Sequence, residues 1–277
     1  MRRRHAAVVD PSGVPRPTAK GVSTATTQAA TSTMRAPTVR AEEGETRTSA
    51  EAPLLRVGAV LGVAGAVLGG AANIVHPALA ERAVDAQVRL VAAFGPWIPV
   101  HLAIAIGGIL VLGGLLAVSR SVDGAAPVAV ARIAFAVAIV GIALNTIEMA
   151  ADGIGLKLAA DTWAAAPDPD KGAAFYGAYA ISRIGAGLAF MQVIVFFGLT
   201  VGAYGVALVV GAGYPRWLGG AGVAIGAINL VIGIARALAP ASIALPIGVS
   251  VSLGLIWIVA VCIVMWSRGA AMRVTAA

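Results

Sequence analysis

The chain has 277 residues, of which 59% are hydrophobic and only 12% charged, and its mean hydropathy is +0.89. Soluble domains are nearer to half apolar and a quarter charged, so this composition indicates an integral membrane protein. The formal charge of +7 does not indicate nucleic-acid binding, because the basic residues gather in the N-terminal tail and beside expected helix ends. The single cysteine, Cys262, excludes an intrachain disulfide and a cysteine metal cluster.

Residues 1–53 are rich in Thr, Ala, Pro and Arg and contain few large apolar residues. We therefore expect a disordered N-terminal tail. The first apolar run begins only after position 53, so no secretory signal peptide is expected, and Met34 is an alternative start to Met1. A second, short tail is expected at residues 268–277.

Six apolar segments follow the tail, each offering the roughly 20 residues that a helix needs to cross a hydrocarbon layer of about 30 Å. Continuous apolar runs exclude barrel strands, which alternate in polarity. The sequence therefore predicts an all-α fold, a bundle of six transmembrane helices over residues 54–267. The expected spans are 54–74, 97–118, 126–149, 173–210, 217–234 and 245–266.

Glycines repeat at helical spacing in three of the expected spans. Small residues at such spacing let helix backbones approach closely in lipid, so they predict a packed bundle. The glycines are Gly58, Gly62, Gly65 and Gly69 in the first span, Gly198 and Gly202 in the fourth, and Gly222 and Gly226 in the fifth.

Lys and Arg residues beside the spans are more numerous on the side of the N-terminal tail than on the opposite side. Positive residues favour cytoplasmic loops. Arg far outnumbers Lys, and Ala and Gly dominate the chain, which indicates a GC-rich bacterial genome. We therefore expect a multi-pass protein of a bacterial plasma membrane, with both termini in the cytoplasm.

The loop between the first two spans carries an amphipathic pattern. Val84, Val88 and Val91 share one helical face, and charged residues lie elsewhere. This pattern predicts a short helix on the outer membrane surface.

Polar residues form a stripe at the end of the third span. At 100° per residue, Asn145, Glu148 and Asp152 lie within one narrow arc. A carboxylate that faces lipid costs free energy, so the stripe is expected to face protein or water. The alternative is that the helix leaves the membrane here and that its acids are solvated.

Five expected helices place polar residues at the same, outer leaflet. This arrangement predicts a pocket that opens outward, with Glu148 and Arg183 as an ion pair. The alternative is that these side chains only snorkel to the interface or cap helix ends. The candidate ligand-binding residues are His76, His101, Asn145, Glu148, Asp152, Arg183 and Arg236.

A metal-site hypothesis takes His76, His101, Glu148 and Asp152 as ligands, since these residue types suit zinc or another divalent ion. The histidines lack the spacing of an HExxH motif, so only the fold could bring them together, and the metal is left unassigned. The sequence contains no GxSxG elbow and no P-loop. It therefore assigns no catalytic residue and no cofactor.

Three motifs in the second half of the chain carry a resemblance: DGIGLKLAADTWAAAP (residues 152–167), FYGAYAISR (175–183) and GYPRWLGGAGVAIGA (213–227). Through them the chain resembles a family of actinobacterial multi-pass membrane proteins that has no assigned activity. The resemblance implies a six-helix architecture and no particular chemistry.

Three functions remain open from the sequence. The first is binding or transport of a small molecule at the outward polar cluster, and the second is a structural or accessory role without a ligand site. The absence of a convincing inverted repeat favours the second over a transporter. The third is a membrane-embedded metal-dependent enzyme. The expected partner is the lipid bilayer, nucleic acid is not expected, and a homo-oligomer is left open.

Overall fold

The structure is a computed structural model that describes residues 36–77, 83–239 and 247–276, with side chains from residue 52 to residue 270 outside the gaps. Contacts divide the chain into two units, Met1–Gly44 and Glu45–Ala277. The described part of the first unit is helical and forms the beginning of α1. Apart from the course of that helix, the description below concerns the second unit. The predicted disorder of residues 1–35 lies outside the described residues.

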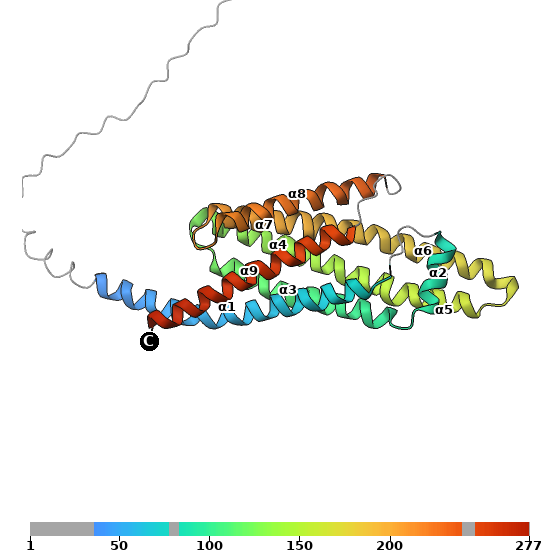
Figure 1. The fold of residues 1–277 in the computed structure, drawn as a ribbon, viewed down its shortest axis with the longest axis horizontal. Coiled ribbons are helices and arrows are strands. Elements are labelled where there is room, and N and C mark those ends of the chain that lie inside the picture. Colours follow the sequence, from blue (N-terminus) through green and yellow to red (C-terminus); the bar gives the residue numbers. More distant parts are fainter. Residues whose placement is uncertain (1–35, 78–82, 240–246, 277) are drawn as a thin grey trace, which may run out of the picture. The chain divides into compact units, whose positions relative to one another are not determined.

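The described chain is helical throughout, and its only β-type pairing is an isolated bridge between Asp123 and Ala212. Six helical segments are long and apolar enough to cross a membrane. The all-α fold with six candidate spans is thereby confirmed (Figure 1). The elements are α1 (Ala36–Val75), α2 (Val84–Ala93), α3 (Trp97–Ser121), α4 (Ala125–Glu148), η1 (Met149–Gly155), α5 (Leu156–Ala165), α6 (Asp168–Gln192), η2 (Val193–Thr200), α7 (Val201–Val210), α8 (Arg216–Leu238) and α9 (Ile247–Ala276), where η marks a π-helix.

The third helix continues well beyond its predicted end at residue 149, whereas the fourth begins five residues before its predicted start and ends at Val210 as predicted. The third is unbroken over Ala125–Ala165 for 41 residues, and the fourth over Asp168–Val210 for 43 residues, against 25 for Trp97–Ser121. At 1.5 Å per residue they are roughly 60 Å long. The third helix therefore does not end near Met149 as predicted. It widens into η1, and α5 then pairs with α6 in a hairpin that projects past the other spans (Figure 1).

The helix α1 begins at Ala36, well before the predicted Leu54. Residues 36–53 contain many Ala, Glu and Arg residues, which have high helix propensity. Adding residues to a helix that already exists costs far less than nucleating one. The helix therefore extends into sequence that is too polar to form a core, while its candidate membrane span begins at Ala52.

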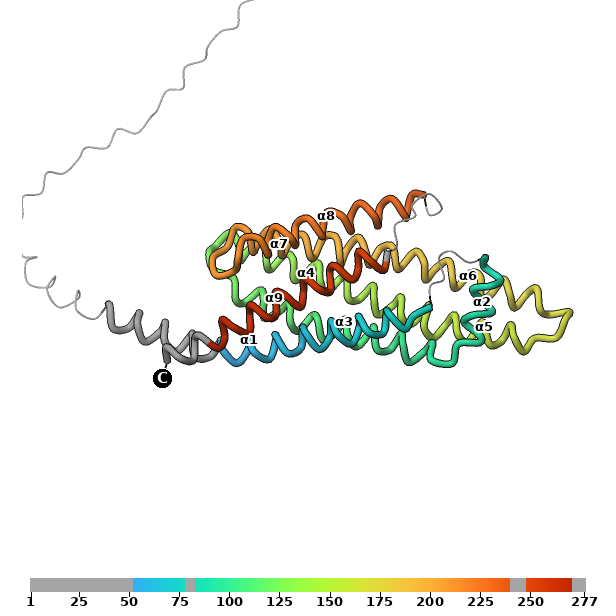
Figure 2. The backbone as a smooth tube through the Cα atoms, in the orientation of Figure 1, coloured from blue at the N-terminus to red at the C-terminus, as the bar shows by residue number. Residues whose placement is uncertain are grey.

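Glycines hold α1 against α3, as the sequence predicts. A Cβ atom on Gly65 would lie only 2.4 Å from the backbone oxygen of Gly107. One on Gly62 would lie 2.3 Å from the Cys262 sulfur, so α9 packs on α1 from another side. Figure 2 shows α9 running beside α1. Dispersion between closely spaced backbones thus replaces the hydrophobic effect in this part of the bundle.

The predicted glycine pairs of the fourth and fifth spans pack against each other. A Cβ atom on Gly226 of α8 would lie 2.5 Å from the Cα atom of Gly202 on α7. One on Gly198 of η2 would lie 3.1 Å from the Cα atom of Leu230. The two stripes therefore form one helix–helix contact.

One end of the bundle is closed by Arg268 of α9. Its guanidinium donates to the backbone oxygen of Ser121 (3.0 Å) and to the Asp123 carboxylate (3.2 Å), and lies 4.8 Å from the centroid of the Tyr214 ring. The loops after α3 and α7 are thereby tied to α9. We call this end the arginine end, after Arg56, Arg120, Arg132, Arg216 and Arg268.

The opposite end carries a small second core. Here α2 lies across the α5–α6 hairpin, with Val88 and Val91 buried against Leu156, Ala160 and residues around them. The Lys157 ammonium also donates to the backbone oxygen of Ala92 (2.9 Å). The predicted amphipathic helix is confirmed, but its apolar face packs against protein and not on the membrane surface.

We predict that Gly65→Ala destabilises the bundle by roughly 1–3 kcal/mol, because the added methyl group meets backbone atoms that cannot rotate away. Gly69→Ala, one turn further along α1, is the matched control, because a Cβ atom there meets nothing within 4 Å. Thermal unfolding in detergent should show a lower Tm for Gly65→Ala and an unchanged or slightly higher Tm for Gly69→Ala. Equal melting temperatures would contradict the close α1–α3 contact.

Candidate functional site

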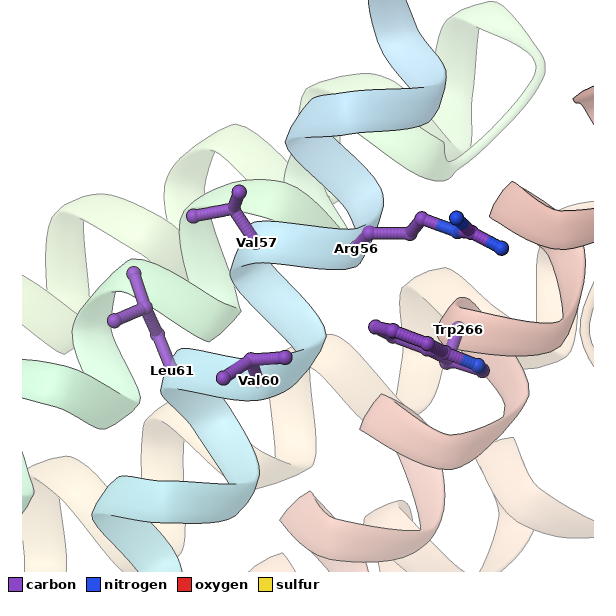
Figure 3. Close-up of a pocket in the computed structure, with 5 residues that line it drawn as sticks. All are labelled: Arg56, Val57, Val60, Leu61 and Trp266. Atoms are coloured by element: carbon purple, nitrogen blue, oxygen red, sulfur yellow. The ribbon is translucent and has the colours of Figure 1, made fainter.

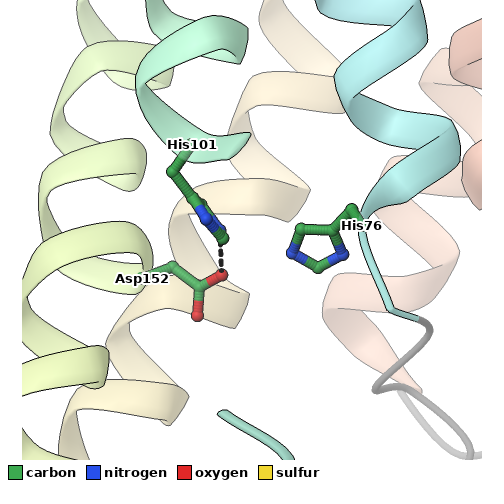
Figure 4. Close-up of side chains that lie close together, drawn as sticks. All are labelled: His76, His101 and Asp152. Carbon is green, nitrogen blue, oxygen red and sulfur yellow. Dashed lines mark hydrogen bonds and ion pairs between the residues drawn. The ribbon is translucent and has the colours of Figure 1, made fainter. Parts of the chain in front are cut away.

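Three titratable side chains meet at the end opposite the arginine end (Figure 4). His76 follows the last residue of α1, His101 lies in the second turn of α3, and Asp152 lies in η1. One potential ligand atom from each lies within 4.8 Å of the other two. We call these residues the histidine triad, and this end of the bundle the histidine end. The structure thus brings together three of the four residues in the metal-site hypothesis.

The hydrogen bonds of His101 fix the chemical state of its ring. Its Nδ1 lies 2.7 Å from the backbone oxygen of Trp97, and a carbonyl can only accept, so Nδ1 carries a hydrogen. Its Nε2 lies 3.0 Å from Oδ2 of Asp152. In a neutral ring of this tautomer, Nε2 presents a lone pair to a carboxylate that is itself an acceptor. A proton or a cation is therefore required between the two atoms.

Trp97 supports both sides of this contact. The residue is fully buried, and its indole Nε1 donates to the backbone oxygen of Asp152 (2.8 Å). Its ring centroid lies 4.7 Å from that of His101 and 4.9 Å from that of His76. The Trp97 indole therefore packs against both imidazoles and hydrogen-bonds to the helical backbone at Asp152.

The π-helical turn η1 brings Asp152 against α3. π-helical turns are frequently found at functional sites. Within this one, a Cβ atom on Gly153 would lie 2.4 Å from Cβ of His101. Only glycine allows η1 to approach α3 this closely at that position.

Two polar side chains lie deeper in the bundle on the same face of α4. Glu148 is 8% exposed, and its Oε2 is buried without a hydrogen-bond partner. Asn145 accepts from Nε2 of Gln192 (2.6 Å), while its own Nδ2 is buried and without a partner. Buried polar atoms are nearly always satisfied by protein, water or an ion. Asn145 and Glu148 of the predicted stripe therefore face the protein interior. The alternative, that the acids of the stripe are solvated, does not hold for Glu148.

The predicted ion pair between Glu148 and Arg183 is wrong. Arg183 is exposed, and its guanidinium lies 5.1 Å from the centroid of the Tyr179 ring. The buried face of α6 is made by Ala178, Ser182 and Gly185, and Arg183 points away from it. Asp152 packs against this buried face, because a Cβ atom on Gly185 would lie 3.3 Å from its Cβ.

Arg236 is not brought to the triad either. It lies in the last turn of α8, which packs on α7, η2, α6 and α9. The predicted outward cluster of seven residues thus separates into the triad, the deeper pair of Asn145 and Glu148, and two arginines elsewhere.

Burial lowers the pKa of His76, which lies just beyond the end of the first span, and the nearby His101 lowers it further. The Asp152 carboxylate acts in the opposite direction. Since burial is the largest cause, the neutral ring is favoured at neutral pH. A neutral imidazole is the form that binds metal ions.

Sequence reasoning missed three residues that shape this site: Trp97, Gly153 and Gln192. Gln192 is the only amide side chain in the fourth apolar segment, so its polarity was a usable signal for a partner on another helix. The indole bond of Trp97 and the close approach of Gly153 depend on the packing of α3 against η1. Nothing in the sequence marks that packing.

No family model, curated protein or solved structure matches this chain in comparisons with known proteins. The six-helix architecture implied by the actinobacterial resemblance is present. Membership of that family stays a prediction.

We predict that Gly153→Ala forces η1 away from α3 and separates Asp152 from His101, since the methyl group has no space beside the His101 side chain. Overpacking of this kind costs roughly 1–3 kcal/mol. Gly155→Ala is the matched control, because its Cβ atom would make only ordinary contacts at 3.5 Å and 3.6 Å. A clear loss of Tm is expected for Gly153→Ala alone. Similar losses of Tm for both variants would show that any added methyl group in η1 destabilises the protein. The close approach of Gly153 to His101 would then not be the cause.

Proposed function

We propose that this integral membrane protein binds a divalent transition-metal ion of the zinc type at the histidine triad. One observation carries the proposal: Nε2 of His101 and Oδ2 of Asp152 lie 3.0 Å apart with the other ring nitrogen of His101 held as a donor. When the His101 ring is neutral, its Nε2 and the carboxylate oxygen of Asp152 are two acceptors turned toward each other. A cation between them removes the repulsion.

The donor set fits such an ion. Two imidazoles and one carboxylate are common ligands of Zn²⁺, and three protein ligands leave a position open to water or substrate. The triad atoms lie within 4.8 Å of one another. Bonds of about 2.0–2.2 Å in tetrahedral geometry would bring them to roughly 3.4 Å. Rotation of the His76 side chain, which follows the end of α1, can supply most of this change.

The surroundings of the triad match those of a metal ligand set. Metal-bound histidines usually donate their second ring nitrogen to a carbonyl or carboxylate, which fixes the tautomer. The backbone oxygen of Trp97 does this for His101, and the Trp97 indole restrains the backbone of Asp152.

Glu148 adds a second carboxylate one helical turn deeper than Asp152. A buried carboxylate without a partner is costly. Asp152 follows Glu148 one helical turn later on the same stripe, so a cation held by Asp152 would favour the charged form of Glu148 as well. Glu148 therefore favours binding of a metal ion over binding of a neutral small molecule. The sequence suggested binding or transport of a small molecule, and we narrow that suggestion to a metal ion.

A second candidate role is structural. The three residues Trp97, His101 and Asp152 already contact one another and join α3 to η1. If His101 carries the required proton, these three residues act as a structural clamp that holds α3 against η1 and needs no ligand. The response of the protein to metal separates the two roles.

We further propose that the arginine end and both termini face the cytoplasm of a bacterial cell. Support comes from the charges of the described residues. Together with Arg47 and Arg273, the arginine end carries seven basic residues, whereas the described histidine end carries five, which are Arg89, Lys157, Lys171, Arg183 and Arg236. By the positive-inside rule the triad then faces outward.

The test uses the full chain, purified in detergent, stripped with a chelator and titrated with Zn²⁺ by calorimetry. We predict one ion per chain, with affinity reduced at least about 100-fold by His101→Ala or Asp152→Asn, since outer-shell changes alone cost about 10–100-fold. Affinity should also fall as the pH is lowered, because protons compete with the ion for the two imidazoles, which must be neutral to bind.

The matched control is Asp161→Asn, which removes an exposed carboxylate on α5 that pairs with Lys157. Its affinity for Zn²⁺ should equal that of the unchanged chain. Metal binding that His101→Ala leaves intact would overturn the site. A lower Tm for His101→Ala together with no effect of Zn²⁺ on the unchanged chain would favour the structural clamp.

A further inference from the structure

A groove lies at the arginine end, on the face of the bundle between α1 and α9. Its volume is about 280 Å³, and it is lined by Arg56, Val57, Val60, Leu61 and Trp266 (Figure 3). Val57 and Val60 are more than half exposed, at 57% and 54%. On a membrane span, such exposed apolar residues face lipid.

Arg56 gives this apolar groove a charged edge. Its guanidinium lies 4.9 Å from the centroid of the Trp266 ring, as Figure 3 shows. The Nε atom is buried without a hydrogen-bond partner, and none of the carboxylates whose side chains the structure describes, between residues 52 and 270, forms an ion pair with Arg56. The side chain thus lies against the Trp266 ring while its buried Nε donor lacks an acceptor.

The position of Arg56 along its helix matches the depth of a lipid headgroup. The apolar segment of α1 runs from Ala52 to Val75, so Arg56 lies about 6 Å inside its end at 1.5 Å per residue. Trp266 on the neighbouring helix is typical of the same interfacial layer. Val57, Val60 and Leu61 extend from this layer toward the middle of the span.

We propose that the groove binds an anionic phospholipid of the surrounding bilayer. The phosphate accepts hydrogen bonds from Arg56, whose planar guanidinium suits a phosphate. One acyl chain lies along Val57, Val60 and Leu61. Arginines outnumber acids at this end, where Arg120, Arg132, Arg216 and Arg268 accompany Arg56, and this excess of positive charge favours an anionic headgroup over a zwitterionic one. This site is independent of the histidine triad.

The experiment measures lipid retention by the full chain. The protein is reconstituted in nanodiscs of equal phosphatidylglycerol and phosphatidylcholine, extracted in mild detergent and examined by native mass spectrometry. We expect one phosphatidylglycerol retained in preference to phosphatidylcholine. Arg56→Gln should lower that retention about fivefold, the loss of one basic contact near the membrane surface.

Two further variants make the result specific. Arg132→Gln removes an exposed arginine on α4 at the same end and should leave retention unchanged. Val60→Trp fills the apolar part of the groove while Arg56 remains, and retention should fall again. If Arg56→Gln fails to fold, the loss of lipid retention by Val60→Trp still tests the groove.

Three outcomes would overturn the proposal. Equal losses for Arg56→Gln and Arg132→Gln would show that only overall charge attracts the lipid. Equal retention of the two lipids would show that the headgroup is not recognised. Displacement of the lipid by millimolar inorganic phosphate would show an anion site without a role for the acyl groove.

Discussion

The contact between His101 and Asp152 is the interaction on which the histidine end depends. Two acceptors face each other at 3.0 Å because the backbone oxygen of Trp97 holds the other ring nitrogen as a donor. That constraint requires a positive charge at a buried point. Around it the structure is arranged to resist relaxation: Trp97 packs on both rings, Gly153 lets η1 approach, and α2 covers the hairpin beyond. These contacts fix the positions of His101 and Asp152, at the place where we propose that a metal ion binds.

The sequence predicted the architecture well because lipid imposes simple rules. Apolar length located all six spans, and the glycine stripes on α1, η2, α7 and α8 were the surfaces that pack. It also offered His76, His101, Glu148 and Asp152 as the ligands of one hypothetical metal site, and the structure brings the first, second and last of these together. Local composition could not predict the continuation of the third helix through η1, because that depends on α6 and α2 covering α5.

The error over Arg183 has a specific physical cause. Opposite charge suggested a partner for Glu148, but helix packing in lipid is decided by small residues. Ala178, Ser182 and Gly185 form the buried face of α6, with Ala178 in the small core beside α2 and α5, and Arg183 is exposed. That small-residue spacing was visible in the sequence and is the better guide to the buried face. Glu148 is left with an unpartnered oxygen beside the triad, which makes a cation there more favourable.

The most direct test of the metal site is the coordination of zinc itself. The full chain loaded with one equivalent of Zn²⁺ is examined by X-ray absorption at the zinc edge. Binding at the triad predicts imidazole scattering from two histidines and nitrogen and oxygen neighbours at about 2.0–2.2 Å. A spectrum without imidazole scattering, like that of hydrated zinc, would contradict the account and leave the triad as a hydrogen-bonded clamp between helices.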